Sequence, residues 1–337
     1  MPKVQKLPSG TYRVQVSKKI DGVLYRESFT DVDPDKALLD AAKWKVNVEN
    51  ENKIDNITLK KAFEKYIDIK DSVLSPSTIR AYKSMSKNVF QNIMDLKIKK
   101  LTAVIIQKEI NLLSITATPK YVRNAYGLLT AVLSVFRPSF KPNISIPKKK
   151  KTEMYIPDDN DIKVLLNAVK GKEIEIPILL AAFGPMRRGE ICALDSNDIN
   201  GNVVTVNKSL VLGDDKKWHI KAPKTYSSYR NIEYPDFVME RLKGRTGKIT
   251  TMTPSAITDA FQKILKKCDL PPFRFHDLRH YAVSTLHAIN VPDKYIMARG
   301  GWATNYTMNN VYNHVLKSKA DEIENQINVH FSNVYSD

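Results

Sequence analysis

The stretch HDLRH at residues 276–280 holds residue types that can bind either a metal cation or a phosphate anion. Two histidines four residues apart beside an acid are typical of a zinc-enzyme helix, whereas His276 and Arg279 suit a phosphate. A zincin helix has glutamate where Asp277 stands, and Arg279 would put a permanent cation beside the metal. His287 does not stand at the spacing of a zincin's third ligand. The stretch therefore favours the anion, with a zinc hydrolase as the alternative.

The stretch GPMRRGEICAL offers arginines that suit the non-bridging oxygens of a phosphodiester. It turns at Gly184 and Pro185 and presents Arg187 and Arg188 before a new helical segment. A guanidinium is planar and always charged, which matches the geometry of a phosphate. Glu190 follows Arg187 by three residues, so its carboxylate could hold an arginine in position.

Proton transfer and nucleophilic attack need further residue types, and candidates for both occur. Lys224 stands beside a turn in APKTYSSYR, where its ammonium could donate a proton. The stretch GGWATNYTMNNVYNHV contains Tyr306 and Tyr312, whose hydroxyls are candidate nucleophiles. Each stretch alone is weak evidence, because a tyrosine in a helix usually packs in a core.

Positive charge gathers in the middle of the chain, whose 337 residues carry a formal net charge of +17. Lys and Arg outnumber Asp and Glu by 19 to 5 over residues 56–152, against 10 to 9 over 1–55 and 24 to 22 over 153–337. A polyanionic partner explains this concentration, since each neutralised phosphate releases counterions. A basic surface that only aids solubility is the alternative.

Residues 1–55 predict a small module of a β-sheet and a helix. Two strands within residues 10–30 meet at the turn dipeptide Asp21-Gly22, and a helix follows over residues 34–49. The apolar strand face is expected to pack on one side of the helix, at Ala37, Leu38, Ala41 and Trp44.

The opposite face of this sheet is polar and basic. It could enter the major groove of DNA, or it could be a solvated face. The candidate contacts are Arg13, Gln15 and Arg26.

Residues 57–137 predict a compact domain of four helices, which carries most of the excess charge. The helices are expected to begin near Thr58, Pro76, Thr102 and Thr118. Residues 138–152 then predict a stiff, basic interdomain linker, because closely spaced prolines prevent a helix. Lys148, Lys149, Lys150 and Lys151 are its candidate DNA contacts, with a plain solvated linker as the alternative.

The remaining residues predict a mixed, mainly helical domain over 153–316. Two strand segments, 201–211 and 218–234, are expected to form a small antiparallel sheet. Helices are expected over residues 157–169, 174–183, 253–268, 275–289 and 292–300. A tail helix over 317–337 either completes this domain or docks on a neighbouring protomer. The fold class is α+β and multidomain.

Composition limits the setting. The hydrophobic fraction of 42% is enough for real cores, and no segment resembles a membrane span or a signal peptide. Cys192 and Cys268 lie far apart among apolar neighbours, so both are expected to be buried thiols in a reducing compartment. A cytoplasmic protein follows.

Taken together and in this order, these stretches resemble the tyrosine recombinases, specifically the integrases of phages and integrative elements. The resemblance rests on GPMRRGEICAL, PKTYSSYR, HDLRH and GGWATNYTMNNVYNH, spread over about residues 155–316. By the same resemblance, the first module looks like an arm-type DNA-binding domain. The helical domain looks like a SAM-like core-binding domain.

The resemblance assigns a role to each matching residue. Arg187, Arg279 and Trp302 would stabilise charge on the phosphoryl oxygens, with Glu190 and His280 in support. Lys224 would be the general acid, and His276 would assist deprotonation of the tyrosine. Tyr312 would be the nucleophile, since Tyr306 lies too close to Trp302. The chain departs from the family's pattern at Gly184-Pro185-Met186 and at Trp302, which cannot exchange a proton but can donate a hydrogen bond.

The resemblance implies DNA cleavage and rejoining through a 3′-phosphotyrosine, with no metal and no cofactor. Implied partners are double-stranded DNA at core-type and arm-type sites, a homotetramer on DNA, and possible excisionase and host DNA-bending factors. The expected setting is the nucleoid of a bacterial host. Alternatives are a type IB topoisomerase, a chromosome-dimer resolution recombinase and a binding-only DNA protein.

Overall fold

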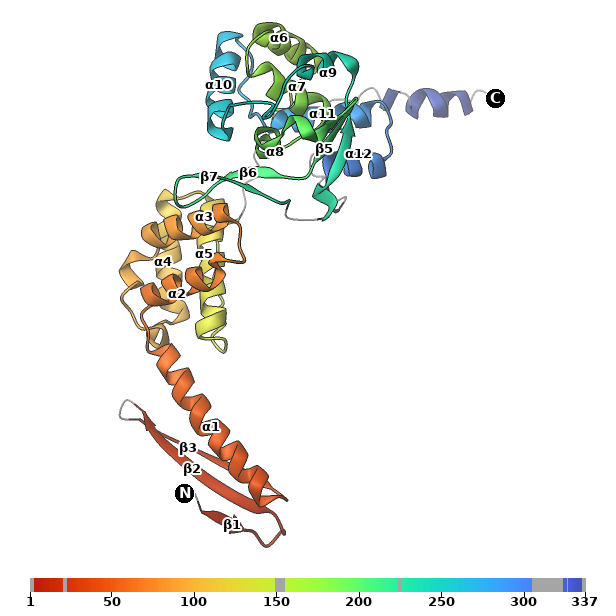
Figure 1. Ribbon diagram of the computed structural model, residues 1–337. Helices are drawn as coiled ribbons and strands as arrows, with labels where there is room; N and C mark the ends of the chain where they lie inside the picture. The colour runs from red at the N-terminus through yellow and green to blue at the C-terminus, as the bar shows by residue number, and fades with distance from the viewer. Residues whose placement is uncertain are drawn as a thin grey trace. The chain divides into compact units, whose positions relative to one another are not determined.

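The computed structural model describes residues 3–20, 23–148, 155–223, 226–304, 324–325 and 327–334. It divides into two compact units, Met1–Lys151 and Thr152–Asp337 (Figure 1). Helices and small antiparallel sheets confirm the α+β class. Among the described helices, none combines the length and the apolar character that crossing a membrane would require.

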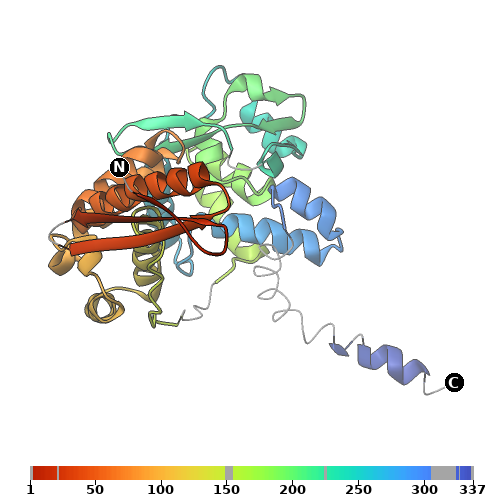
Figure 2. The same ribbon diagram turned by 90° about the horizontal axis from the view of Figure 1, so that it is seen from below.

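The first unit begins with a sheet that one helix covers (Figure 2). Strands β1 (Val4–Lys6), β2 (Tyr12–Ile20) and β3 (Val23–Asp31) pair antiparallel in that order, and α1 (Pro34–Asp55) follows. Val14 and Val16 are buried against Ala37 and Ala41, with Leu38 and Trp44 partly buried beside them, as predicted. The sequence did not predict β1, and α1 is longer than expected. The predicted turn, Asp21-Gly22, lies outside the described residues.

The strand register brings the basic candidates to one face. Arg13 lies opposite Thr30, Gln15 opposite Ser28, and Ser17 opposite Arg26. Residues directly opposite in a sheet share a face, so Arg13, Gln15 and Arg26 all point away from α1. All of them are exposed.

The four predicted helices of the next segment are present. They are α2 (Leu59–Asp71), α3 (Pro76–Asn88), α4 (Ala103–Thr116) and α5 (Pro119–Phe136), with the short 3₁₀ turns η1 (Gln91–Ile93) and η2 (Ile98–Lys100) between α3 and α4. Thr58, Thr102 and Thr118 cap three of them, each accepting a hydrogen bond from a backbone N–H of the first turn. The core is aliphatic and aromatic, and includes Leu59, Phe63, Ile106, Leu129 and Leu133.

The segment predicted as a linker is instead fixed on the helical core up to Pro147. Its Ser145 exchanges hydrogen bonds with Gln107 on α4. Tyr126 and Arg123 on α5 donate to the carbonyls of Pro142 (3.1 Å) and Pro147 (3.0 Å). Prolines do prevent a helix here, but the exposed carbonyls of this extended chain find donors on α4 and α5.

The second unit is a mainly helical domain with strands at one side. Its helices are α6 (Asp159–Val169), α7 (Glu175–Phe183), α8 (Arg188–Ala193), α9 (Asp236–Leu242), α10 (Pro254–Lys267), α11 (Asp277–Ala288) and α12 (Asp293–Gly300). Its 3₁₀ turns are η3 (Ser196–Asp198) and η4 (Tyr226–Ser228). Helix α7 is apolar on all sides and packs against α8, α9 and α11, so it forms the centre of the domain.

The strands form two small sheets instead of the single sheet predicted. Strands β4 (Ile199–Asn200), β5 (Val203–Val206) and β8 (Arg230–Glu233) pair in that order, and β6 (Ser209–Leu212) pairs separately with β7 (Trp218–Lys221). Helix α9 was not predicted. Cys192 is buried as expected, but Cys268 is only half-buried, because it lies at the end of α10. In the tail, residues 324–325 and 327–334 are helical.

Candidate phosphate-binding site

Arg187 lies at the start of α8, where Glu190 fixes it twice. The Glu190 carboxylate accepts a bond from the backbone N–H of Arg187 (2.8 Å) and another from its Nη1 (2.7 Å). The side chain of Arg187 stays 37% exposed, whereas that of Glu190 is 5% exposed. The predicted support of an arginine by Glu190 is therefore present, and it leaves part of the Arg187 guanidinium open to a ligand.

The same carboxylate also holds a second arginine that the sequence did not single out. Arg230, at the start of β8, donates from Nη2 to Glu190 Oε2 (2.8 Å) and from Nη1 to Oε1 (3.3 Å). Burial alone would raise the pKa of Glu190, but the Arg230 and Arg187 guanidiniums outweigh it and lower that pKa. Glu190 is therefore an anion between two cations. A sequence signal existed, because Arg230 stands two residues before Ile232 and four before Tyr234. Side chains at this spacing share one strand face, and this face is buried.

Arg279, on the first turn of α11, is almost completely buried at 1% exposure. It donates to the carbonyl of Pro185 and, at 2.7 Å, to that of Gly300, and its guanidinium lies 3.9 Å from the ring centroid of Trp302. Burial, with Arg187 and Arg230 nearby, lowers the pKa of Arg279. Since a guanidinium stays protonated in proteins, positive charge is costly here and an anion would relieve that cost.

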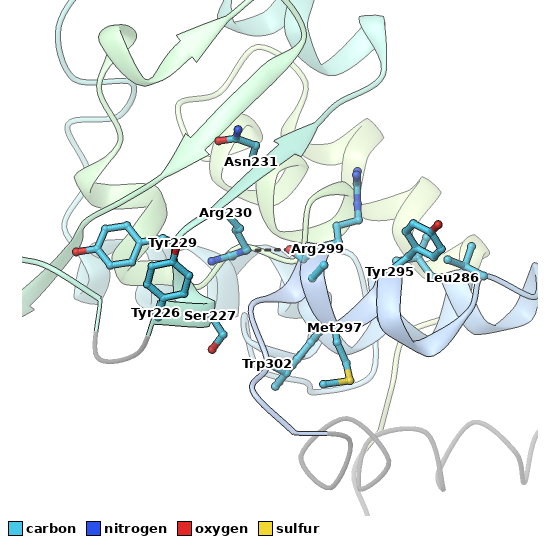
Figure 3. A pocket seen from close by; sticks show the side chains of 12 residues that line it. Tyr226, Ser227, Tyr229, Arg230, Asn231, Leu286, Tyr295, Met297, Arg299 and Trp302 are labelled. Atoms are coloured by element: carbon cyan, nitrogen blue, oxygen red, sulfur yellow. Dashed lines mark hydrogen bonds between the residues drawn. The ribbon is translucent and has the colours of Figure 1, made fainter.

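The end of α12 brings these arginines together. The carbonyls of Arg299, Gly300 and Gly301 accept bonds from Arg230 (2.8 Å), Arg279 (2.7 Å) and Arg187 (3.3 Å), respectively. These carbonyls have no partner within the helix, so the arginines satisfy them. Figure 3 shows the bond from Arg230 to the Arg299 carbonyl, with Trp302 just beyond the end of the helix.

The glycines at this helix end are required by geometry. Gly301 has a φ of +70°, in the left-handed region that favours glycine. A Cβ added to Gly300 would overlap the Trp302 ring. The absence of side chains at both positions lets Trp302 fold back over Arg279.

His276 precedes α11 and contacts His280, with ring centroids 5.0 Å apart and ring planes at 87°. Surrounding protein atoms and the nearby His280 and Arg279 lower the pKa of His276 to about 4, although the residue keeps an exposed side. Its imidazole is therefore neutral at pH 7 and can accept a proton.

The metal alternative has no geometric support in the described part of the chain. Asp277 is 2% exposed, and its closest charged partner is Arg274 (2.8 Å), with His280 Nε2 farther away at 3.8 Å. The described residues contain no group of three His, Cys, Asp or Glu side chains placed to hold a metal ion.

A cavity of about 740 Å³ adjoins this cluster (Figure 3). Its wall is largely aromatic and aliphatic, with Tyr226, Tyr229, Leu286, Tyr295 and Trp302 among the lining residues.

Comparison with known protein families adds independent evidence. The model of the phage integrase family matches residues 158–319, and that of the phage integrase N-terminal SAM-like domain matches residues 58–114. The chain belongs to the phage integrase family, the tyrosine recombinases. The two matched segments cover most of the second unit's core and the first helices of the helical domain.

This integrase-family chain is distantly similar to a curated recombinase. A tyrosine recombinase XerC-like protein of Caldanaerobacter subterraneus subsp. tengcongensis is 25% identical over 214 residues, covering 52% of this chain and 55% of that protein. The chain thus spans about half the length of this curated relative.

Solved structures of integrases share the fold of this chain. The Tn1549 transposon integrase in complex with transposon right end DNA has a TM-score of 0.67 at 15% identity, covering 80% of this chain and 99% of that one. A lambda integrase tetramer bound to a Holliday junction has a TM-score of 0.60 at 15% identity, covering 90% and 96%. At this identity the likeness shows the fold.

The structure brings together only some of the residues predicted for the integrase site. Arg187, Glu190, Arg279 and Trp302 converge on the end of α12, and His276 and His280 lie beside Arg279 on α11. Lys224, Tyr306 and Tyr312 lie outside the described residues, as do Lys149, Lys150 and Lys151. Lys148 is exposed next to the fixed segment.

Proposed function

We propose that the protein is a site-specific DNA recombinase, an integrase that cleaves and rejoins DNA strands through a 3′-phosphotyrosine intermediate. One observation carries this proposal: Arg187 and Arg279 meet at the end of α12, with Trp302 over Arg279, and Glu190 balances their charge only in part. Cations held in a fixed geometry suit the charge that develops on phosphoryl oxygens.

The reaction follows from these groups. Tyr312 attacks the phosphorus and releases the 5′-oxygen, which takes a proton from Lys224. Neutral His276 accepts the proton that leaves the tyrosine hydroxyl. Arg187, Arg279 and the Trp302 indole N–H bind the non-bridging oxygens. The 5′-hydroxyl of a partner strand then reverses the attack, so the bond energy of the phosphodiester is conserved.

The arrangement of domains extends the proposal to partners. Residues 1–55 would bind arm-type sites through Arg13, Gln15 and Arg26, and residues 57–137 would bind core-type sites. Within the segment 138–152, Lys148 and the lysines that follow it would contact the DNA duplex. The catalytic domain would span 153–316, and the tail, 317–337, would dock on a neighbour in a tetramer. An excisionase and a host DNA-bending protein are the accessory partners that this class of reaction would use, at the nucleoid of a bacterial cell.

Covalent capture tests the proposal without requiring a defined recognition sequence. A pool of random-sequence duplexes, each nicked so that a cleaved strand end diffuses away, is incubated with the protein and denatured. Protein-linked DNA is then recovered and sequenced, which also yields a captured duplex for later assays. The expected result is a covalent adduct that maps to Tyr312 and is absent from Tyr312→Phe, which still binds the captured duplex.

Two other outcomes are informative. An adduct of unchanged yield in Tyr312→Phe would overturn the assignment of the nucleophile. Relaxation of supercoiled plasmid without strand exchange between two captured duplexes would favour a topoisomerase instead.

A further inference from the structure

Arg230 is a buried arginine that the proposed reaction does not use. Its side chain is 4% exposed, and each of its guanidinium nitrogens donates a hydrogen bond. Nη2 and Nη1 reach Glu190, Nη1 also reaches the Ser228 carbonyl (3.1 Å), and Nε reaches the Arg299 carbonyl (2.8 Å). With Nε, Nη1 and Nη2 all donating to protein atoms, Arg230 does not present a free edge to DNA.

The contacts of Arg230 join segments that carry proposed catalytic residues. Glu190 lies on α8, which Arg187 begins. Ser228 ends η4, four residues after Lys224 in the chain. The Arg299 carbonyl lies at the end of α12, next to the glycines that let Trp302 fold over Arg279.

We propose that Arg230 is a positioning residue for phosphate binding: it holds the Glu190 carboxylate beside Arg187 and fixes the end of α12 under Trp302. This inference rests on the proposed recombinase function. It assigns Arg230 no contact with DNA and no proton transfer.

Charge balance explains why a second arginine belongs at Glu190. If Arg187 were the sole partner of this buried carboxylate, the pair would be neutral and the Arg187 guanidinium would be drawn away from a ligand. Arg230 adds a charge, so Arg187, Arg230 and Arg279 together outweigh Glu190 by two positive charges. A phosphodiester brings one negative charge and gains more as the nucleophile attacks, which this excess would stabilise.

Hydrogen-bond geometry explains why the residue is an arginine. A guanidinium is a rigid planar fork that can bind a carboxylate with two nitrogens while its Nε points elsewhere. A lysine ammonium keeps the charge but cannot span Glu190, Ser228 and Arg299 from one fixed plane. Arg230→Lys therefore keeps the positive charge but removes the fixed set of hydrogen bonds, so it tests the effect of positioning alone.

The first experiment compares Arg230→Lys with the wild type on the captured duplex. We expect single-turnover formation of the covalent adduct to slow by about 10²-fold, since small misplacements of catalytic groups cost this much, with unchanged affinity for DNA. The matched control is Arg241→Lys on α9, which replaces an arginine paired with Glu175 (3.2 Å) and should leave both quantities unchanged. A normal rate in Arg230→Lys would overturn the inference.

A second measurement needs no DNA, so it separates failure of this inference from failure of the proposed function. The chain has three tryptophans, and replacing Trp44 and Trp218 by Phe leaves Trp302 as the fluorescent reporter. We expect Arg230→Lys to raise acrylamide quenching of Trp302, because the end of α12 loses its bond to Arg230. Unchanged quenching in a folded variant would overturn the inference even if no duplex were ever captured.

A double variant guards against a folding defect. Removing Arg230 alone leaves a buried carboxylate with one partner, whereas Arg230→Gln with Glu190→Gln removes both charges together. If Arg230 acts through Glu190, Glu190→Gln should slow adduct formation nearly as much as the double variant does. If the rate reductions of Arg230→Gln and Glu190→Gln multiplied in the double variant, Arg230 would not act through Glu190.

Discussion

The two units of this chain use positive charge in opposite ways. In the helical part of the first unit the charge is mostly lysine on the surface, including the exposed Lys60, Lys65, Lys97, Lys99, Lys100 and Lys108. In the second unit the decisive charges are arginines, of which Arg230 and Arg279 are buried and bonded to fixed carbonyls or to Glu190.

The difference separates affinity from chemistry. A lysine ammonium at the surface is mobile and hydrated, so it attracts a polyanion from many directions and is weakened by salt. A buried arginine is costly to desolvate, but its position is fixed before any ligand arrives. Changes to the first unit should therefore alter binding, and changes to the arginine cluster should alter the reaction of bound DNA.

The largest effect is expected from Arg279→Ala. The variant loses a cation at the phosphate and leaves the carbonyls of Pro185 and Gly300 without this donor. We expect single-turnover adduct formation to fall by about 10²–10³-fold, with a lower melting temperature, while the affinity for the captured duplex changes little. Arg241→Ala is the control, and a rate close to wild type in Arg279→Ala would contradict the assigned role.

A methyl group at Gly300 tests the same cluster by shape instead of charge. Gly300→Ala places a Cβ against the Trp302 ring, so the indole must leave the face of Arg279. We expect a loss of about 10²-fold in adduct formation, measured as above. Gly127→Ala on α5 meets no atom within 4 Å and should instead stabilise the helical domain by about 0.5–1 kcal/mol in urea denaturation. Equal rates for the two variants would show that the Trp302 position does not matter.

Replacing surface lysines should have a smaller effect, and it should change the affinity for DNA instead of the rate of the reaction. Replacing Lys97, Lys99 and Lys100 by glutamine is expected to weaken DNA binding, with the slope of log K against log salt falling by about 0.9 for each phosphate that is no longer neutralised. The reaction rate of bound DNA should stay constant. The matched triple on α10 replaces the equally exposed Lys263, Lys266 and Lys267. If that control weakened binding as much, the helical domain would not be the main basic surface.

The smallest effect concerns the protonation of His276 in the free protein. Its pKa of about 4 predicts an imidazole signal that titrates well below the ordinary 6.5 in NMR, assigned by its loss in His276→Gln. The sign for stability follows. Below pH 6.5 the unfolded chain binds a proton that folded His276 does not, so the free energy of unfolding falls as the pH drops toward 4, and less so in His276→Gln. Titration at 6.5 would show that neither burial nor the neighbouring His280 and Arg279 lowers the pKa of this ring.

Much of the fold could be predicted from the sequence because local signals were strong. Thr58, Thr102 and Thr118 precede periodic apolar runs, and each caps the helix that follows. The three residues of β1 are too short for a periodic signal. The docking of residues 138–147 depends on donors from α4 and α5, which no pattern within that segment reveals.

The site was predictable in its residue types but not in its connections. Arg187, Arg279 and Trp302 stand in recognisable stretches, whereas their meeting at the carbonyls of α12 depends on tertiary packing. Arg230 was missed because a single arginine in a short strand usually faces solvent. The burial of its strand face distinguishes it.

The fixing of Pro147 by Arg123 sets the length of the tether between the two units. Among the described residues, the next anchor along the chain is Tyr155, whose hydroxyl donates to Asp161 Oδ2 (2.6 Å), so seven residues lie between the two anchors. Such a segment spans roughly 30 Å when fully extended. Once the first unit has bound DNA, a tether this short confines the second unit to a small volume near that DNA. The effective concentration of the second unit there is on the order of millimolar. Inserting a flexible segment here would dilute that concentration without altering any contact of either unit.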